Sequence, residues 1–217
     1  MSLKDEIYND INSNCDILLG ILKDKERTND TPEGRMIFQC LWLKEQIIAK
    51  KLPLPVTEHV NTLKHVAAEN LLEHLASNEH DYWNEIGIYL YRLLFLVDGK
   101  PLIKPSYYFP ASNLIDGLIN LLEQSPRALD DYEQGLTSEL QKMKERLFNN
   151  EMEPPLGSSL PDYPNFNKVN RYQPTIEDIH NGKYLIKTVA NLIFNGVRPG
   201  TWFSPEQANI EVTALLT

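Results

Sequence analysis

The sequence has no uninterrupted apolar run of about 18 residues, the length that a helix needs to cross a bilayer. Its first residues, MSLKDEIYND, lack the basic and then apolar layout of a secretory signal peptide. Only two cysteines occur, Cys15 and Cys40, which are too few for a disulfide framework. Each lies on the apolar stripe of a predicted helix, so we expect buried thiols and no cysteine chemistry. These absences predict a soluble, cytoplasmic protein with no membrane partner.

The motifs of common catalytic and nucleotide-binding sites are also missing. The chain contains no Gly-x-x-x-x-Gly-Lys phosphate loop, no Gly-x-Gly-x-x-Gly, no Gly-x-Ser-x-Gly elbow and no His-Glu-x-x-His. One Glu-x-x-His runs from Glu177 to His180, but a carboxylate-bridged di-metal bundle needs two such helices. We therefore predict no cofactor and no metal, and we interpret this stretch as the first turn of a helix capped by Thr175.

Positive charge is scarce, because 21 Lys and Arg residues stand against 30 Asp and Glu residues, for a net charge of −9. Nucleic-acid binding needs a basic surface. The cations in mild local excess are too sparse to form one: Lys168, Arg171, Lys183, Lys187 and Arg198. The acidity is concentrated between Glu58 and Asp98, where seven carboxylates and two cations give a net charge of −5. Such a field attracts basic partners and repels nucleic acids and anionic membranes.

Apolar residues recur at helical spacing through most of the chain, and no strand pattern survives comparison with them. With 217 residues, of which 42% are hydrophobic, the chain can bury a sizeable core. The predicted helices span residues 2–23, 32–51, 57–77, 82–97, 111–124, 126–148 and 175–195, and an eighth begins at Ser204-Pro205. We predict a single all-α domain of about eight helices over residues 1–217.

Residues 149–174 interrupt this pattern with five prolines and no periodicity. Irregular segments of this length are uncommon and tend to be functional or disordered. Three aromatic residues, Tyr163, Phe166 and Tyr172, favour a segment packed onto the body of the protein, because a disordered linker has little use for them. We therefore predict an irregular strap or loop ahead of the last two helices.

The predicted helix 57–77 separates polar from apolar residues. At 100° per residue, its polar residues fall within an arc of about 80°. They are Glu58, Thr62, His65, Glu69 and Glu73. Carboxylates four residues apart repel by about 0.2–0.5 kcal/mol per pair unless solvent, a protonated histidine or a cationic partner relieves them. This arc is either the solvated face of an acidic bacterial-type protein or a docking face for a basic protein.

The docking interpretation extends to the acidic residues that follow this helix. We predict these partner-binding residues: Glu58, His65, Glu69, Glu73, Glu79 and Glu85. Asp81 is interpreted instead as the N-cap of the next helix.

The segment IGIYLYRLLFLV, residues 86–97, is apolar nearly all round yet too short for a membrane, which predicts a central core helix. Arg92 lies in its middle. An unpaired buried guanidinium is costly, so we expect it to meet a carboxylate or several carbonyls, with Asp116 or a residue of helix 126–148 as partner in a structural salt bridge. An anion-binding role for Arg92 is the alternative.

The dipeptide His80-Asp81 resembles the His-Asp pair of HD-type metal-dependent phosphohydrolases. The resemblance implies an upstream histidine (His59 or His65), a downstream aspartate (Asp116 or Asp130) and a metal that activates water on a phosphate. It covers one dipeptide, in the polar junction LASNEHDYW at a helix boundary rather than inside an apolar helix. This enzyme class is the alternative function.

Charge and the missing catalytic motifs together predict a non-enzymatic, protein-binding function. The hypothesis is an acidic inhibitor or immunity-type protein that uses the acidic face to neutralise a basic partner such as a toxin. A helical module that binds a small anionic ligand around Arg92 is a third hypothesis.

Overall fold

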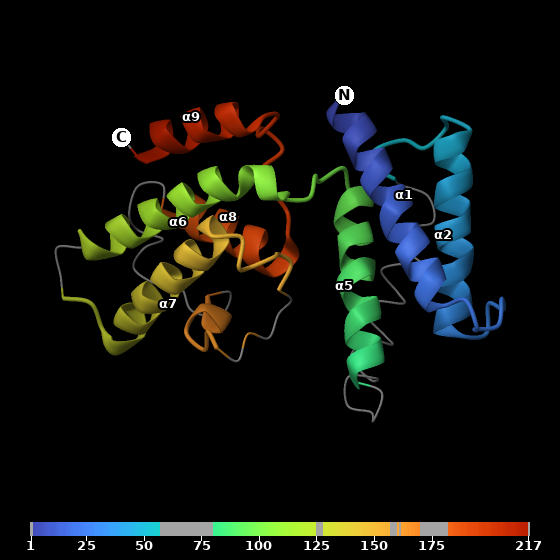
Figure 1. Ribbon diagram of the computed structural model, residues 1–217, viewed down its shortest axis with the longest axis horizontal. Helices are drawn as coiled ribbons and strands as arrows, with labels where there is room; N and C mark the ends of the chain where they lie inside the picture. The colour runs from blue at the N-terminus through green and yellow to red at the C-terminus, as the bar shows by residue number, and fades with distance from the viewer. Residues whose placement is uncertain are drawn as a thin grey trace. The chain divides into compact units, whose positions relative to one another are not determined.

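The computed structural model describes residues 2–56, 80–124, 128–156, 160, 162–169 and 182–216 (Figure 1). Over these ranges it contains seven α-helices, two short 3₁₀ helices and no strand, which confirms the predicted all-α class for this part of the chain. The predicted helix 57–77 lies outside the described residues. The chain divides into two compact units, Met1–Leu102 and Ile103–Thr217, and each is described by itself. The single domain over residues 1–217 stays a prediction.

The first unit is built on three described helices, with α1 in the middle. α1 (Leu3–Ile21) packs against α2 (Pro32–Ile48) and α5 (His80–Val97), and both neighbours run antiparallel to it (Figure 1). Side chains with at most 1% exposure fill the core of this unit: Ile11, Cys15, Leu18, Met36, Cys40, Leu43, Leu90 and Leu93. The predicted burial of both cysteines is thereby confirmed.

Capping residues fix where α1 and α2 begin, close to the predicted starts at residues 2 and 32. The Ser2 hydroxyl accepts a hydrogen bond from the Asp5 N–H (3.2 Å), and the Asp5 carboxylate accepts one from the Ser2 N–H (3.0 Å). The Thr31 hydroxyl accepts one from the Gly34 N–H (3.1 Å) at the start of α2. A Cβ on Gly34 would lie 1.8 Å from the Thr28 carbonyl oxygen, so the close approach of this loop requires glycine.

The second unit is organised around α6. Its helices are α6 (Tyr108–Glu123), α7 (Asp131–Phe148), α8 (Gly182–Asn195) and α9 (Pro205–Leu216), with the 3₁₀ helices η1 (Pro105–Tyr107) and η2 (Phe166–Lys168). α6 contacts the other three α-helices, and more than half of its residues are buried (Figure 1). The core of this unit therefore surrounds α6. The predicted start of the helix before α9, at residue 175, lies outside the described ranges.

Two helices begin earlier than predicted. α6 begins at Tyr108 and not at residue 111, because η1 leads directly into it and Pro110 falls in its first turn, where a missing N–H costs little. α5 (His80–Val97) already includes His80, so Asp81 lies inside the helix and the prediction that it is the N-cap is wrong.

α7 begins later than predicted, at Asp131 and not at Pro126. The Glu133 N–H donates to the Asp130 carboxylate (2.8 Å), and the Asp130 N–H donates to the Glu133 carboxylate (3.1 Å). This reciprocal capping box fixes the start of the helix. Leu129, which the periodicity placed on the helix, precedes it.

The segment 149–174 is irregular in its described residues apart from η2, as predicted. Its apolar side chains join the core of the second unit: Met152, Leu160, Tyr163, Phe166 and Val169. The Asn167 side chain closes a local loop, since it accepts from the Leu160 N–H (3.0 Å) and donates to the Leu160 carbonyl (2.7 Å). The described part of this segment is thus held onto the unit by apolar burial and by its own polar contacts.

A buried carboxylate on α7 also holds this segment. Glu139 is 6% exposed and accepts hydrogen bonds from the Asn165 N–H (3.1 Å), the Asn165 side-chain amide (2.7 Å) and the Phe166 N–H (2.7 Å). A Cβ on Gly135 would lie 2.4 Å from the Asn165 side chain, so a glycine lets the segment approach α7 closely. The charge of Glu139 is balanced by donors of the irregular segment.

Candidate functional site

Most of the predicted partner-binding residues lie outside the part of the chain that the structure describes. These are Glu58, His65, Glu69, Glu73 and Glu79. The sixth, Glu85, is exposed near the start of α5. The acidic face stays a prediction, and Glu85 is the residue from which the described surface can be followed.

Exposed apolar side chains continue from Glu85 along α5. Ile88 is 39% exposed and Tyr91 is 45% exposed, and the three residues follow one another at three-residue spacing. Trp83 and Leu90, on the opposite side, are buried. The predicted core helix is therefore buried on the side that carries Trp83 and Leu90, whereas the side that carries Ile88 and Tyr91 is exposed.

Arg92 is partly buried within α5, and its guanidinium lies over the Tyr89 ring, 5.4 Å from the ring centroid. Asp116, one of its predicted partners, pairs with Lys144 at 2.7 Å within the second unit. Because Arg92 and Asp116 belong to different units, the Arg92–Asp116 ion pair stays a prediction. A cation–π contact with a neighbouring turn of the same helix is what the structure shows for this guanidinium.

A further exposed feature lies on α2, away from its buried face. Phe38 is 42% exposed, Leu41 is 38% exposed, Ile48 is 78% exposed, and Glu45 is exposed among them. With steps of three, four and three residues, these four positions fall within an arc of about 80°. We name Phe38, Leu41, Glu45 and Ile48 the outer α2 seam. A surface helix normally turns polar residues to solvent, so this seam is a candidate docking face.

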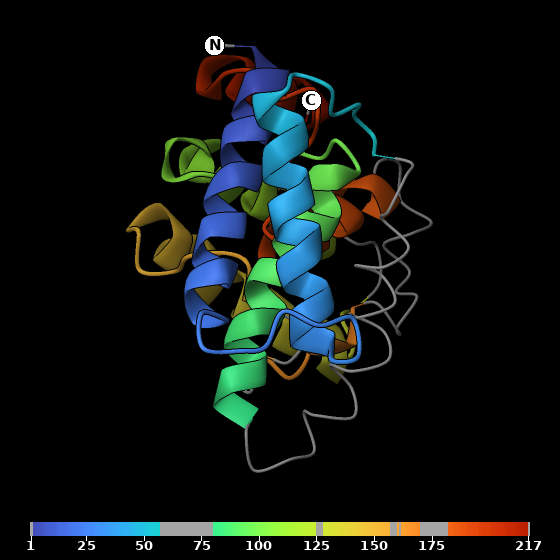
Figure 2. The same ribbon diagram turned by 90° about the vertical axis from the view of Figure 1, so that its right-hand side faces the viewer.

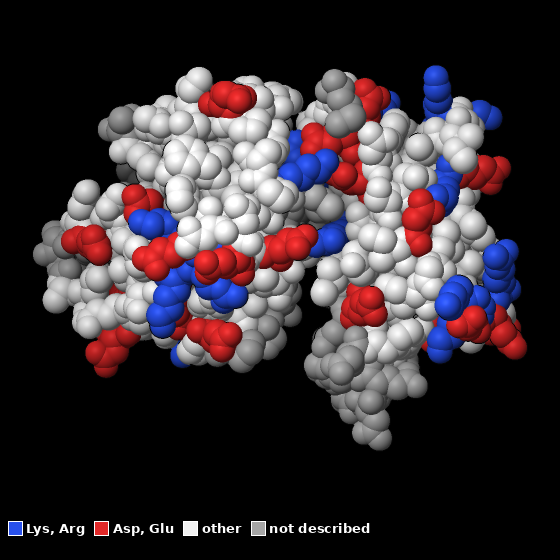
Figure 3. Space-filling model, in the orientation of Figure 1, with Lys and Arg blue, Asp and Glu red and all other residues white. Residues whose placement is uncertain are grey.

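The carboxylate of the outer α2 seam, Glu45, differs from the other charged groups around it. Figure 2 looks onto α2, and no described helix lies in front of it. Lys44, the neighbour of Glu45, pairs with Asp16 on α1. On the face drawn in Figure 3, acidic and basic side chains are interspersed over both units, without one continuous acidic area among the described residues. A carboxylate among exposed apolar side chains therefore sets the seam apart from ordinary charged surface.

The two buried cysteines meet between α1 and α2. A hydrogen bond between the Cys15 and Cys40 thiols, together with burial, raises the pKa of Cys15 well above its ordinary value. Neither side chain has exposed surface. A protonated, enclosed thiol is a poor nucleophile and a poor metal ligand, so this pair serves the packing of the two helices.

The residues of the phosphohydrolase alternative are either undescribed or engaged in other contacts. His59 and His65 lie outside the described residues, and only the backbone of His80 is described. Asp116 forms an ion pair between α6 and α7, and Asp130 caps α7. Within the described ranges, no group of three or more His, Cys, Asp or Glu side chains could hold a metal ion. This part of the chain therefore offers no observation in favour of that enzyme class.

The outer α2 seam was not predicted from the sequence, because the stripe through Met36, Cys40 and Leu43 already accounts for a buried face of the helix. The sequence nevertheless contains the pattern that indicates this seam. From Phe38 to Ile48, apolar residues at helical spacing form a second stripe, which one acid interrupts. Two apolar stripes on one helix indicate two contact surfaces.

None of the described helices is both long enough and apolar enough to cross a membrane. No protein-family model matches the sequence, and no curated protein or solved structure matches it significantly. The function must therefore be inferred from the residues of the chain itself.

Proposed function

We propose that the chain binds another protein by packing a helix of that partner along the outer α2 seam. The observation that carries this proposal is the exposure of Phe38, Leu41 and Ile48 on a helix whose other side is buried. Apolar side chains gathered on one exposed face mark interaction sites, whereas scattered ones do not. Removing them from water supplies the favourable free energy of binding.

The seam has the spacing of a coiled-coil contact. Phe38 and Glu45 correspond to a positions of a heptad, and Leu41 and Ile48 correspond to d positions. A seam of this kind accepts the side chains of a second helix that crosses at about 20°. It extends over about three helical turns, so a partner helix of similar length covers it.

Glu45 sets the chemistry of the partner. A carboxylate enclosed in an apolar interface is costly unless a cation or hydrogen-bond donors meet it. A partner helix with Lys or Arg opposite Glu45 provides that cation, and a single polar a position specifies register and partner. A second copy of this chain fits less well, because antiparallel pairing about a twofold axis sets Glu45 against Leu41.

We propose in addition that the partner is basic and that binding neutralises it, as an inhibitor or immunity-type protein neutralises a toxin. The support is the net charge of −9 and its concentration between Glu58 and Asp98, which accelerates encounter with a basic protein. Glu85, exposed beside Ile88 and Tyr91, adds a described surface that combines acid with apolar side chains.

Affinity capture from the native cell lysate tests this function with four baits. They are the wild-type chain, Glu45→Lys, Ile48→Ser and the control Ile17→Ser, which removes a 41% exposed side chain on α1 outside the seam. We expect one basic protein to be retained by the wild type and the control, and retention to fall at least about tenfold for both seam variants. A partner retained equally by all four baits would show that the seam is not the docking face.

A further inference from the structure

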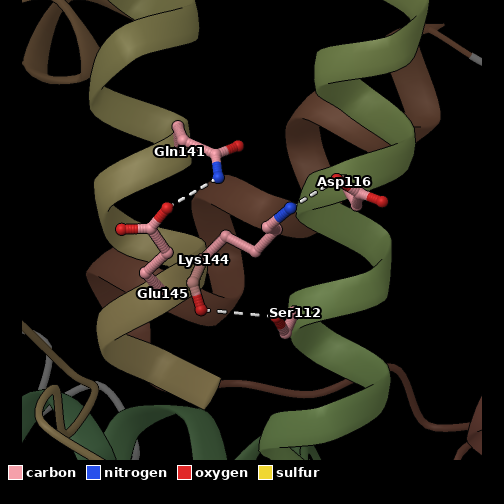
Figure 4. Close-up of polar contacts among 5 residues, drawn as sticks. All are labelled: Ser112, Asp116, Gln141, Lys144 and Glu145. Atoms are coloured by element: carbon pink, nitrogen blue, oxygen red, sulfur yellow. Dashed lines mark hydrogen bonds and ion pairs between the residues drawn. The ribbon is translucent and has the colours of Figure 1, made fainter. Parts of the chain in front are cut away.

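A groove lies between α6 and α7 in the second unit, whereas the outer α2 seam belongs to the first. It has a volume of about 260 Å³ and is open to solvent. Its lining includes Ser112 and Asp116 of α6 and Lys144 and Glu145 of α7 (Figure 4). Phe148 of α7 lines it as well. The groove shares no residue with the docking face proposed on α2, so a role for one is independent of a role for the other.

The floor of the groove is closed by contacts between the two helices. The Lys144 ammonium reaches from α7 to the Asp116 carboxylate (2.7 Å), and the Ser112 hydroxyl donates to the Lys144 carbonyl (3.3 Å) (Figure 4). Lys144 is thereby neutralised, and Ser112 is only 4% exposed. The groove is therefore neither an anion site built on Lys144 nor a nucleophile site built on Ser112.

Phe148 lines the groove, and its ring packs against that of Phe109. Phe109 on α6 is 51% exposed and Phe148 on α7 is 56% exposed. Their ring centroids are 6.1 Å apart, so together they form an apolar platform that joins the two helices. Exposed aromatic side chains beside a concave surface are typical of binding sites, because they add large contact area at little cost in side-chain entropy.

Glu145 gives the groove its charge. The carboxylate is exposed and accepts one hydrogen bond, from the Gln141 side chain on the same helix (2.8 Å), which is a neutral donor (Figure 4). No cation of the described residues forms an ion pair with it. It also lies in the last turn of α7, where the helix macrodipole adds negative potential. A cation from outside therefore gains from the carboxylate and from the helix end.

We propose that this groove binds a peptide segment of another protein in which an arginine is followed by an apolar residue. The guanidinium pairs with Glu145, and the apolar side chain lies on the platform of Phe109 and Phe148. Asn113 and Asn149 line the same groove. The Asn113 amide nitrogen donates to the Asn209 side chain (3.0 Å), so Asn113 offers its remaining N–H and its oxygen, and Asn149 its side-chain amide, to the peptide backbone. Arginine fits better than lysine, because its planar donors pair with both carboxylate oxygens and its face stacks on an aromatic ring.

An NMR titration of the 217-residue chain with two peptides tests the charge requirement. The first probe is a capped Gly-Arg-Leu-Gly peptide, and the second carries citrulline, which keeps the shape of arginine without its charge. We expect the arginine peptide to bind with a Kd on the order of 1–10 mM and to shift the backbone signals of Glu145 and Phe148. The citrulline peptide should bind at least about fivefold more weakly.

Three variants identify the residues that act. Glu145→Gln should remove the difference between the two peptides, and Phe148→Ala should weaken both; these side chains are exposed, so the fold is retained. Glu123→Gln, an exposed acid of α6 that does not line the groove, should bind both peptides as the wild type does. The proposal is overturned if the two peptides bind the wild type equally, or if the shifts are confined to other helices. It is also overturned if no signal shifts at 10 mM peptide, which is about the weakest Kd expected.

Discussion

Replacing Glu139 by alanine tests how the irregular segment is held on the second unit. The Glu139 carboxylate is 6% exposed and accepts three hydrogen bonds at 2.7–3.1 Å, two from Asn165 and one from the buried N–H of Phe166. Alanine removes the shared acceptor and leaves the Phe166 donor without water or a partner. The variant should therefore lose stability through the irregular segment rather than through the helix that carries the substitution.

The size of the loss follows from these bonds. A hydrogen bond to a charged group contributes about 1.5–3 kcal/mol, and a buried donor left unpaired costs about 1–3 kcal/mol. The Asn165 groups are only partly buried and regain water, so their loss counts for less. We expect the free energy of unfolding to fall by about 3 kcal/mol in Glu139→Ala. For a chain of this length, the corresponding fall in Tm is roughly 6–12 °C.

Urea unfolding followed by circular dichroism measures this loss, and amide hydrogen exchange at Phe166 locates it. Glu139→Gln should cost less, about 1–2 kcal/mol, because the amide keeps one acceptor oxygen. Glu123→Ala, at an exposed acid of α6, should stay within about 0.5 kcal/mol of the wild type. A cost below about 1 kcal/mol for Glu139→Ala would refute the view that this carboxylate holds the segment.

Three other features give direct expectations. Cys15 and Cys40 should react with a thiol reagent only as fast as local or global unfolding exposes them, because both are buried and the pKa of Cys15 is raised. Rapid labelling without urea would contradict this. Gly34→Ala should destabilise the protein by at least about 2 kcal/mol in thermal unfolding, because the new Cβ would overlap a backbone carbonyl. The control Gly20→Ala should not destabilise the protein, because the space around Gly20 is open. Glu45→Leu should raise the dimer fraction in sedimentation velocity by making the outer α2 seam fully apolar, and an unchanged dimer fraction would count against that seam as a contact surface.

Helix starts could be predicted from the sequence where one capping signal stood alone. Ser2 marks the start of α1 and Thr31 marks the start of α2, and the structure confirms both. The start of α7 was missed because two signals compete, Ser125-Pro126 and the Asp130–Glu133 pair. A reciprocal capping box satisfies two backbone donors, whereas a proline at a first turn satisfies none, so the capping box decides where the helix begins.

The side of a helix that meets solvent could not be predicted from periodicity. A periodic pattern shows that a face is apolar, but it does not show whether another element covers that face. For this reason the nearly all-apolar sequence of α5 predicted a central core helix, although Ile88 and Tyr91 are exposed. Contacts such as that between Glu139 and Asn165 could not be predicted either, because the two residues are 26 positions apart and Asn165 lies in an irregular segment without periodicity.

Acidic charge alone does not distinguish a docking surface from a solvated one, and the sequence hypothesis depended mainly on charge. The structure adds exposed apolar side chains beside two carboxylates, with Glu45 between Leu41 and Ile48, and Glu145 beside Phe148 in one groove. At such positions a partner gains apolar burial only if it also brings a cation, so affinity and specificity are coupled. Long-range attraction governs the association rate, whereas desolvated pairs govern the dissociation rate. Charge reversal at Glu45 or Glu145 should therefore speed dissociation of a basic partner more than it slows association.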